Sequence, residues 1–142
     1  MWNLSFDGAV SKEGSGVGIW VSNSQTNHSE DHSYKLNFQC SNNIAEYEAL
    51  ILGLQLLKKL GAKRIAFHGD SELIIKQIKG EYSAKHPRMR SYRNVVLDFL
   101  ESFIEYILSV VPRDQNILPD GLATLASTCK MHIGLVTNIL LK

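Results

Sequence analysis

Apolar and polar residues alternate along three stretches near the start of the chain. These stretches are residues 3–7, 16–22 and 33–40, and a loop and then a polar turn over residues 23–31 separate them. Alternation with a period of two is typical of a strand that has one buried face. Three consecutive strands joined by turns predict an antiparallel meander.

The pattern changes to a helical period between residues 41 and 60. Leucines recur three and four residues apart in this stretch, and Ser41 is a good N-terminal capping residue. Glu46 lies on the same apolar stripe, one turn before Leu50. A carboxylate that faces a core lowers stability unless a cation meets it. Glu46 therefore either lies at a helix end outside the core or binds a cation.

Strands and helices alternate along the rest of the chain. The expected elements are a strand over 63–69, a helix over 71–79, a helix over 88–105, a strand over 106–111 and a helix from Pro119 to about Ser127. A strand, a helix and a strand in this order pair in parallel through a right-handed crossover. We therefore expect an α/β domain with a mixed five-stranded sheet, three antiparallel strands followed by two parallel ones, and helices on its faces.

Chain length and composition limit the class of protein. A chain of 142 residues is typical of one domain, expected here over 1–127, with 128–142 as an apolar tail or a linker to a neighbouring domain. No apolar run approaches the roughly 18 residues of a membrane span, and the start of the chain lacks a signal-peptide pattern. Cys40 and Cys129 have no metal-type spacing, which indicates reduced thiols in the cytoplasm or the nucleus.

Positive charge is concentrated in the middle of the chain, although the net charge is only +1. Ten of the 15 Lys and Arg residues lie between Lys58 and Arg93, together with three of the 14 acidic residues. Such a segment indicates a surface that faces phosphates. Solvated helix faces explain the same charges equally well.

Four acidic residues lie where predicted strands end or predicted helices begin: Asp7, Glu46, Asp70 and Asp120. In an α/β sheet, strand ends beside helix starts are where sites form. Carboxylates that converge there cannot all stay ionised without cations. Mg²⁺ prefers oxygen ligands, and two ions about 4 Å apart are a known arrangement for phosphodiester cleavage. Each acid taken alone has a second explanation, because solvent-facing strand positions and helix N-termini favour acidic residues.

The sequence around these acids resembles type 1 ribonuclease H, most closely the branch found in plant gypsy-type LTR retrotransposons, where the domain is associated with a reverse transcriptase. The resemblance covers residues 2–127. Its motifs are Phe6-Asp7-Gly8-Ala9, Asn42-Asn43-x-Ala45-Glu46-Tyr47-x-Ala49-Leu50, Gly69-Asp70-Ser71 and Pro112-Arg113-x-x-Asn116-x-x-x-Asp120-x-Leu122-Ala123, and the segment 79–92 is similar as well.

The resemblance implies a ribonuclease H-like fold and an endonuclease that cuts the RNA strand of an RNA–DNA hybrid. It implies that the four acids hold two Mg²⁺ ions, for which Mn²⁺ can substitute. It further implies a monomer when isolated, or a domain beside the reverse transcriptase or integrase of a polyprotein. The implied nucleic-acid contacts are Ser41, Asn42, Asn43, Ser71, Lys76, Lys79, Lys85, Arg88, Arg113 and Asn116.

Three departures from the family pattern favour a second hypothesis, a catalytically weak or inactive nucleic-acid-binding module of a domesticated retroelement. The loop over 113–119 lacks the histidine of many cellular members. Gly121 follows Asp120 where alanine is usual, so the last helix is expected to fray. Glu72 replaces a common glutamine and adds a negative charge. A third hypothesis, an interaction domain within a polyprotein, rests on the apolar tail.

Overall fold

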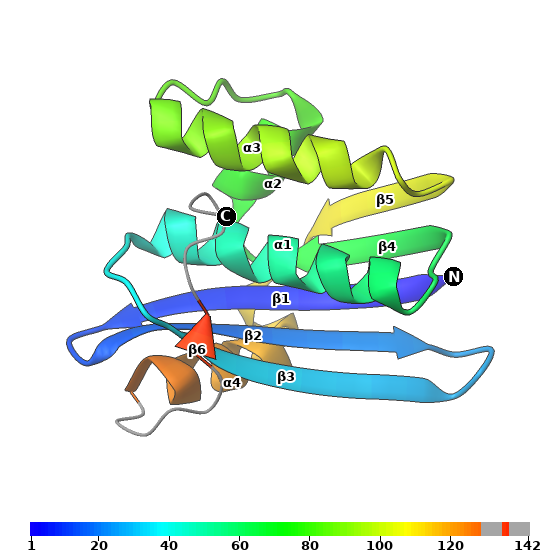
Figure 1. Ribbon diagram of the computed structural model, residues 1–142, viewed down its shortest axis with the longest axis horizontal. Coiled ribbons are helices and arrows are strands. Elements are labelled where there is room, and N and C mark those ends of the chain that lie inside the picture. Colours follow the sequence, from blue (N-terminus) through cyan, green and yellow to red (C-terminus); the bar gives the residue numbers. More distant parts are fainter. Residues whose placement is uncertain (129–134, 137–142) are drawn as a thin grey trace.

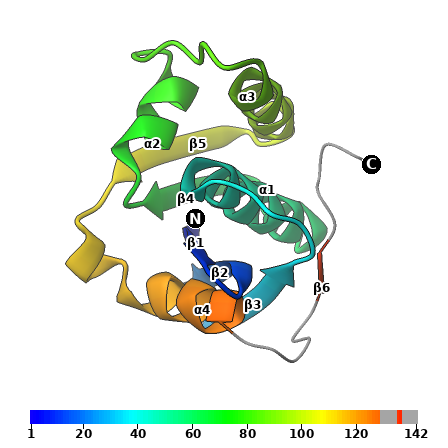
Figure 2. The same ribbon diagram turned by 90° about the vertical axis from the view of Figure 1, so that its left-hand side faces the viewer.

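One mixed sheet lies at the centre of the molecule, with helices on both of its faces (Figure 1, Figure 2). The computed structural model describes residues 1–128 and 135–136. The strands follow the order β5-β4-β1-β2-β3-β6 across the sheet. Along the chain the elements are β1 (Trp2–Ser11), β2 (Gly14–Asn23), β3 (His28–Leu36), α1 (Asn42–Lys59), β4 (Arg64–Gly69), α2 (Glu72–Lys79), α3 (Pro87–Leu100), β5 (Glu105–Val110), the 3₁₀ turn η1 (Arg113–Gln115), α4 (Ile117–Thr128) and β6 (Leu135–Val136).

The pairing of the strands matches the predicted mixed sheet. β1 pairs antiparallel with β2, and β2 pairs antiparallel with β3. β4 pairs in parallel with β1, and β5 in parallel with β4. The five predicted strands and their directions are therefore confirmed. β6 adds a short strand beside residues 35–36 of β3, while residues 129–134 and 137–142 of the predicted tail lie outside the described part of the chain.

The two faces of the sheet carry different helices. α1, α2 and α3 lie over one face, and α4 lies over the other (Figure 2). Leu4 and Phe6 of β1 are fully buried, and Leu4 packs closely on Gly53 of α1, where a Cβ would lie 2.6 Å from the Leu4 side chain. Because side chains alternate along a strand, Asp7 belongs to the other face of β1. The strand was expected to end at Asp7, but it continues to Ser11.

β3 both begins and ends earlier than residues 33–40, the range predicted from apolar alternation. Asn27 has a positive φ of 56°, which permits a tight turn immediately before β3. Much of β3 lies at the edge of the sheet and is half-buried or exposed, so polar residues are tolerated along it. Glu30 lies between His28 and His32 and contacts both. Because these residues are polar, the first part of β3 shows no apolar alternation, and the predicted strand was therefore placed too late in the sequence.

α3 is shorter than the predicted helix over 88–105. A turn over residues 101–104 follows it, and Phe103 packs against the core from that turn. The Ile104 N–H donates to the carbonyl of Lys63 at 2.8 Å, which brings the chain beside β4 as β5 begins. Two apolar residues that were assigned to a helix therefore belong to a turn. In the described part of the chain, no helix combines the length and the apolar character that a bilayer crossing needs.

α4 is a continuous helix, contrary to the fraying that was expected at Gly121. The structure shows open space around residue 121, because a Cβ there would meet no atom within 4 Å beyond the neighbouring residues and backbone of its own helix. Gly121 is exposed and does not have a positive φ. The methyl group of an alanine at residue 121 would therefore fit without a steric clash.

Gly121→Ala is expected to raise the free energy of unfolding by about 0.5–1 kcal/mol, because alanine loses less backbone entropy in a helix. The measurement is a urea unfolding curve of each variant. Gly80→Ala is the matched control, because Gly80 also has free space but has a φ of 83°, so alanine should be destabilising there. Equal effects of the two substitutions would contradict this account.

Candidate active site

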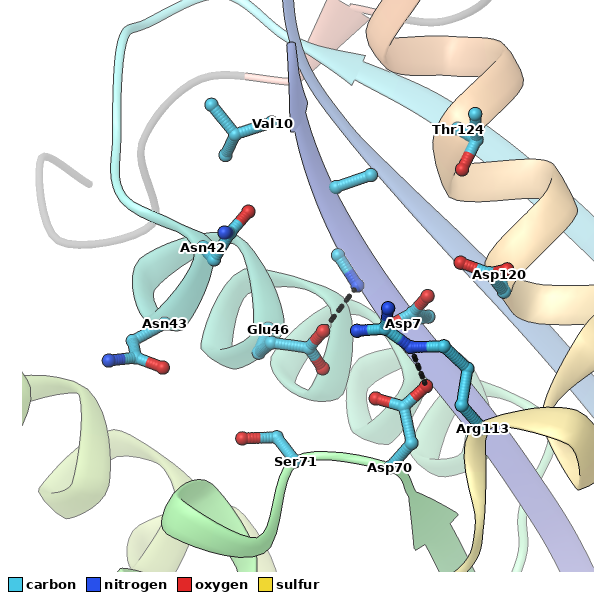
Figure 3. A pocket seen from close by; sticks show the side chains of 12 residues that line it. Asp7, Val10, Asn42, Asn43, Glu46, Asp70, Ser71, Arg113, Asp120 and Thr124 are labelled. Carbon is cyan, nitrogen blue, oxygen red and sulfur yellow. Dashed lines mark hydrogen bonds and ion pairs between the residues drawn. The ribbon is translucent and has the colours of Figure 1, made fainter.

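The four predicted acids line one cleft of about 390 Å³, formed where β1, α1, β4 and α4 meet (Figure 3). Asp7 comes from β1, Glu46 from α1, Asp70 from the end of β4, and Asp120 from the first turn of α4. Asp7 and Glu46 are 4% and 6% exposed. Of the two alternatives for Glu46, an exposed helix end is therefore excluded. The elements on both faces of the sheet contribute to the cleft.

A close contact between β1 and α1 places Glu46 in this cleft. The backbone N–H of Gly8 donates to Glu46 Oε1 at 3.1 Å (Figure 3). A Cβ on Gly8 would lie 2.6 Å from both the Ala45 carbonyl oxygen and the Glu46 nitrogen. Any side chain at residue 8 would therefore push the strand and the helix apart. At its start α1 is fixed by Ser41, whose hydroxyl accepts from the Ile44 N–H at 3.3 Å.

Three of the acids can present oxygen atoms to one cation. One carboxylate oxygen from each of Asp7, Glu46 and Asp70 lies within 4.8 Å of the others. Glu46 Oε2 and Asp70 Oδ2 are buried and accept no hydrogen bond from the described residues. Arg113 Nε lies 3.8 Å from Asp70 Oδ2, an ion pair that is too long for a hydrogen bond. Such oxygen atoms fit the preference of a hard divalent cation.

Burial keeps protons on this cluster when no cation is bound. It raises the pKa of Asp7 from 3.8 to about 7, and the nearby Asp120 and Asp70 carboxyl groups add to the increase. It raises the pKa of Glu46 from 4.5 to about 10, and the Asp7 carboxyl group adds to this increase. The cause is the cost of moving a charge out of water, together with repulsion between like charges.

Several of the predicted nucleic-acid contacts surround the cleft. Asn42 and Asn43 project from the start of α1, and Ser71 and Arg113 complete the rim (Figure 3). A second hollow of about 600 Å³ adjoins the cleft at Asn43 and is lined by three further predicted residues, Ser41, Lys85 and Arg88. The structure therefore brings seven of the ten predicted contact residues to two adjoining hollows.

The other three predicted contact residues lie elsewhere. Lys76 pairs with Glu72 at 2.7 Å and lies over the Tyr82 ring, so the extra negative charge of Glu72 is neutralised one turn away. Lys79 is exposed at the end of α2. Asn116 is only 1% exposed, and its Nδ2 donates to the Phe6 carbonyl at 3.0 Å. A direct contact between Asn116 and nucleic acid is therefore not supported.

Two buried hydrogen bonds that the sequence did not indicate hold α1 in place. The Tyr47 hydroxyl donates to Gln77 Oε1 of α2, and the Tyr92 hydroxyl of α3 donates to Glu48 Oε1, both at 2.6 Å. The two tyrosine rings are stacked with centroids 5.8 Å apart. Because Tyr47 and Glu48 directly follow Glu46, these bonds connect the acid to the helices that carry much of the basic segment.

Residues 5–126 match the family model described as "Reverse transcriptase-like". The chain is 35% identical to Ribonuclease HI of Halobacterium salinarum over 85 residues, which are 60% of this chain and 43% of that protein. It is 33% identical to the bifunctional protein Rv2228c of Mycobacterium tuberculosis over 110 residues, which are 78% of this chain and 30% of that protein. The chain thus spans less than half the length of these two relatives.

Solved structures agree with this family. The crystal structure of RNase H1 from Halobacterium salinarum superposes with a TM-score of 0.82 at 29% identity, covering 88% of this chain and 96% of that one. The N-terminal RNase H domain of Rv2228c gives a TM-score of 0.82 at 29% identity, covering 89% and 92%. LC11-RNase H1 in complex with RNA/DNA hybrid gives 0.79 at 25% identity, covering 89% and 96%. The protease–reverse transcriptase of prototype foamy virus, at 15% identity, shares the fold.

Asp7→Asn is expected to stabilise the metal-free protein at neutral pH. The folded-state pKa of Asp7 is raised above 3.8 to about 7, so the folded state holds a proton that the unfolded chain releases. Stability therefore falls as the pH rises from about 4 to about 7, and asparagine removes that loss. Each pKa unit corresponds to about 1.4 kcal/mol, so the gain should be on the order of a few kcal/mol.

The measurement is the unfolding free energy in a chelator across this pH range. Asp98→Asn is the matched control, because Asp98 is exposed on α3 and should leave the pH dependence unchanged. If Asp7→Asn loses stability with rising pH as steeply as the wild type, the raised pKa is wrongly assigned to Asp7.

Proposed function

We propose that this chain, which belongs to the reverse transcriptase-like family, is a ribonuclease H that cuts the RNA strand of RNA–DNA hybrids. The observation that carries the proposal is the convergence of the Asp7, Glu46 and Asp70 oxygens within 4.8 Å, with Asp120 on the facing wall (Figure 3). Relatives named Ribonuclease HI and RNase H1, one of them solved with an RNA/DNA hybrid, support the same activity.

The four acids are the residues that would hold divalent metal. Two bound Mg²⁺ or Mn²⁺ ions would supply a water of lowered pKa and neutralise negative charge at the scissile phosphate. The protein's own part is to hold desolvated carboxylates at fixed positions, which it does through the Gly8 contact and the buried tyrosine bonds. Fixed charges of this kind need little reorganisation during the reaction.

The residues around the cleft would position the hybrid. Asn42 and Asn43 can donate and accept hydrogen bonds beside the acids, where a 2′-hydroxyl distinguishes RNA from DNA. Lys85 and Arg88 of the adjoining hollow would contact phosphates, and such contacts weaken with salt. The Arg113 guanidinium is 82% exposed next to Asp70. Arg113 lies in the loop that lacks the histidine of many cellular members, and it would contact a phosphate in the cleft.

The context of the domain is part of the proposal. The segment 79–92 favours the plant gypsy-type retrotransposon branch, and the fold shared with a foamy virus protease–reverse transcriptase is in keeping with a polyprotein domain. We place the protein in a reducing compartment, the cytoplasm or the nucleus, as a monomer when isolated. The second candidate, a weakly active hybrid-binding module, rests on the missing loop histidine, while the continuous helix α4 argues against it.

The direct test is cleavage of a labelled RNA–DNA hybrid in Mg²⁺, beside RNA–RNA and DNA–DNA duplexes of the same sequence. We expect cutting of the RNA strand in the hybrid alone. Asp70→Asn should abolish it, and the exposed-site control Asp98→Asn should retain it. Hybrid binding without cleavage in either Mg²⁺ or Mn²⁺ would instead favour the binding module.

Metal affinity is expected to rise with pH, because a cation must displace the protons held by Asp7 and Glu46. Below the Asp7 pKa of about 7, the apparent affinity for Mn²⁺ should fall by about tenfold for each pH unit and each displaced proton. The measurement is the Mn²⁺ concentration that raises the thermal unfolding midpoint at several pH values. An apparent Mn²⁺ affinity that does not change with pH would contradict this prediction.

A further inference from the structure

We propose that Asn116 is a positioning residue that fixes the Asp120 carboxylate relative to Asp7. This inference rests on the proposed function, because it concerns the geometry of the same acid cluster. The geometry differs from that of a nucleic-acid contact, because Asn116 is 1% exposed.

The side chain of Asn116, the residue immediately before α4, joins the start of that helix to β1. Its Nδ2 donates to the carbonyl oxygen of Phe6 at 3.0 Å, across 110 positions of sequence. Phe6 directly precedes Asp7, so the bond holds the strand at the residue next to the acid. Water cannot compete for a bond between two buried groups, which makes it a firm link.

The backbone of Asn116 orders the chain that leads to Asp120. Its N–H donates to the Arg113 carbonyl at 3.0 Å and closes η1. Its carbonyl accepts from the Asp120 N–H at 3.1 Å, within the first turn of α4. One residue therefore contacts the peptide before Asp7, the peptide of Asp120 and the peptide of Arg113, whose side chain pairs with Asp70.

Other contacts hold the rest of α4. The Ser33 hydroxyl donates to the Leu122 carbonyl at 2.6 Å, and the Ser11 hydroxyl donates to the Ser127 carbonyl at 3.0 Å. These bonds act on the middle and the C-terminal end of the helix. Loss of the Asn116 bond should therefore leave α4 docked but release its first turn, which carries Asp120.

Only the NH₂ group of the Asn116 amide has a hydrogen-bond partner among the described residues, which favours a role in positioning. Its Oδ1 is buried and accepts no hydrogen bond from the described residues. A buried acceptor without a partner lowers stability. An aliphatic residue of similar size would avoid that loss, but it could not bind the Phe6 carbonyl. Leucine would also leave the buried Phe6 carbonyl without its amide donor, so the two effects on stability oppose each other.

The test compares Asn116→Leu with Ser127→Ala in the full chain. Leucine keeps the volume of residue 116 and removes the donor. Ser127 is buried at the other end of α4, where its hydroxyl donates to the Thr124 carbonyl of the same helix. Each variant is assayed for Mn²⁺ binding by thermal shift, for hybrid binding in a chelator, and for kcat and KM as a function of metal concentration.

For Asn116→Leu we expect Mn²⁺ affinity and kcat to fall by about 10- to 100-fold. Hybrid affinity in the chelator should be unchanged, and high Mn²⁺ should restore part of kcat. Ser127→Ala should match the wild type in all three assays. A misplaced metal ligand raises the metal concentration needed for half-maximal activity. A general loss of folded protein instead lowers metal binding, hybrid binding and kcat together.

Two results would overturn the inference. Weaker hybrid binding by Asn116→Leu with an unchanged metal dependence would assign Asn116 to the nucleic acid. Equal losses in Asn116→Leu and Ser127→Ala would mean that only the stability of α4 matters. Asn116→Ala, which removes the donor without adding a charge, replaces leucine if that variant does not fold. If the wild type does not cleave hybrid, the proposed function fails, while Mn²⁺ binding still decides the role of Asn116.

Discussion

The desolvation of the acid cluster is the constraint on which the rest of the structure depends. Asp7 and Glu46 are almost completely buried, and burial of their charges is unfavourable without a cation. The fold accepts this loss because Gly8 lets α1 approach β1 closely enough for a backbone N–H to reach Glu46 Oε1. One such hydrogen bond offsets only part of the loss. The cluster is therefore a place where the empty protein gives up stability to hold a geometry.

Rigid connections around the cluster compensate for its unfavourable charge. The Tyr47–Gln77 and Tyr92–Glu48 bonds tie α1 to α2 and α3, on one face of the sheet. The Asn116–Phe6 bond ties α4 to β1, on the other face. The acids thus come from layers that are each fastened to the central strand or to the neighbouring helices. A cluster of like charges would otherwise push these layers apart.

The sequence allowed the parts of this site with local signals to be predicted. The motifs around Glu46, Asp70 and Asp120 lie near strand and helix ends that turn and capping residues mark, Asp7 lies within β1, and the structure brings the four acids to one cleft. Features that depend on contacts between distant parts of the chain were not predicted. β3 is polar because it lies at an edge, and Glu48 looks like an ordinary helix-surface residue although Tyr92 buries it. Asn116 was assigned to nucleic acid because a motif does not show which way a side chain faces.

If the acid cluster binds metal as proposed, metal binding and folding must be coupled in this protein. The empty cluster holds protons at neutral pH, and Arg113, the cation paired with Asp70, is 82% exposed on the 3₁₀ turn. An exposed guanidinium at 3.8 Å neutralises a buried carboxylate only weakly. A divalent cation that binds the folded cluster would have no comparable site in the unfolded chain, so it would stabilise the fold by mass action. The burial that makes the metal-free domain less stable is therefore the same feature that would give the cleft an affinity for cations.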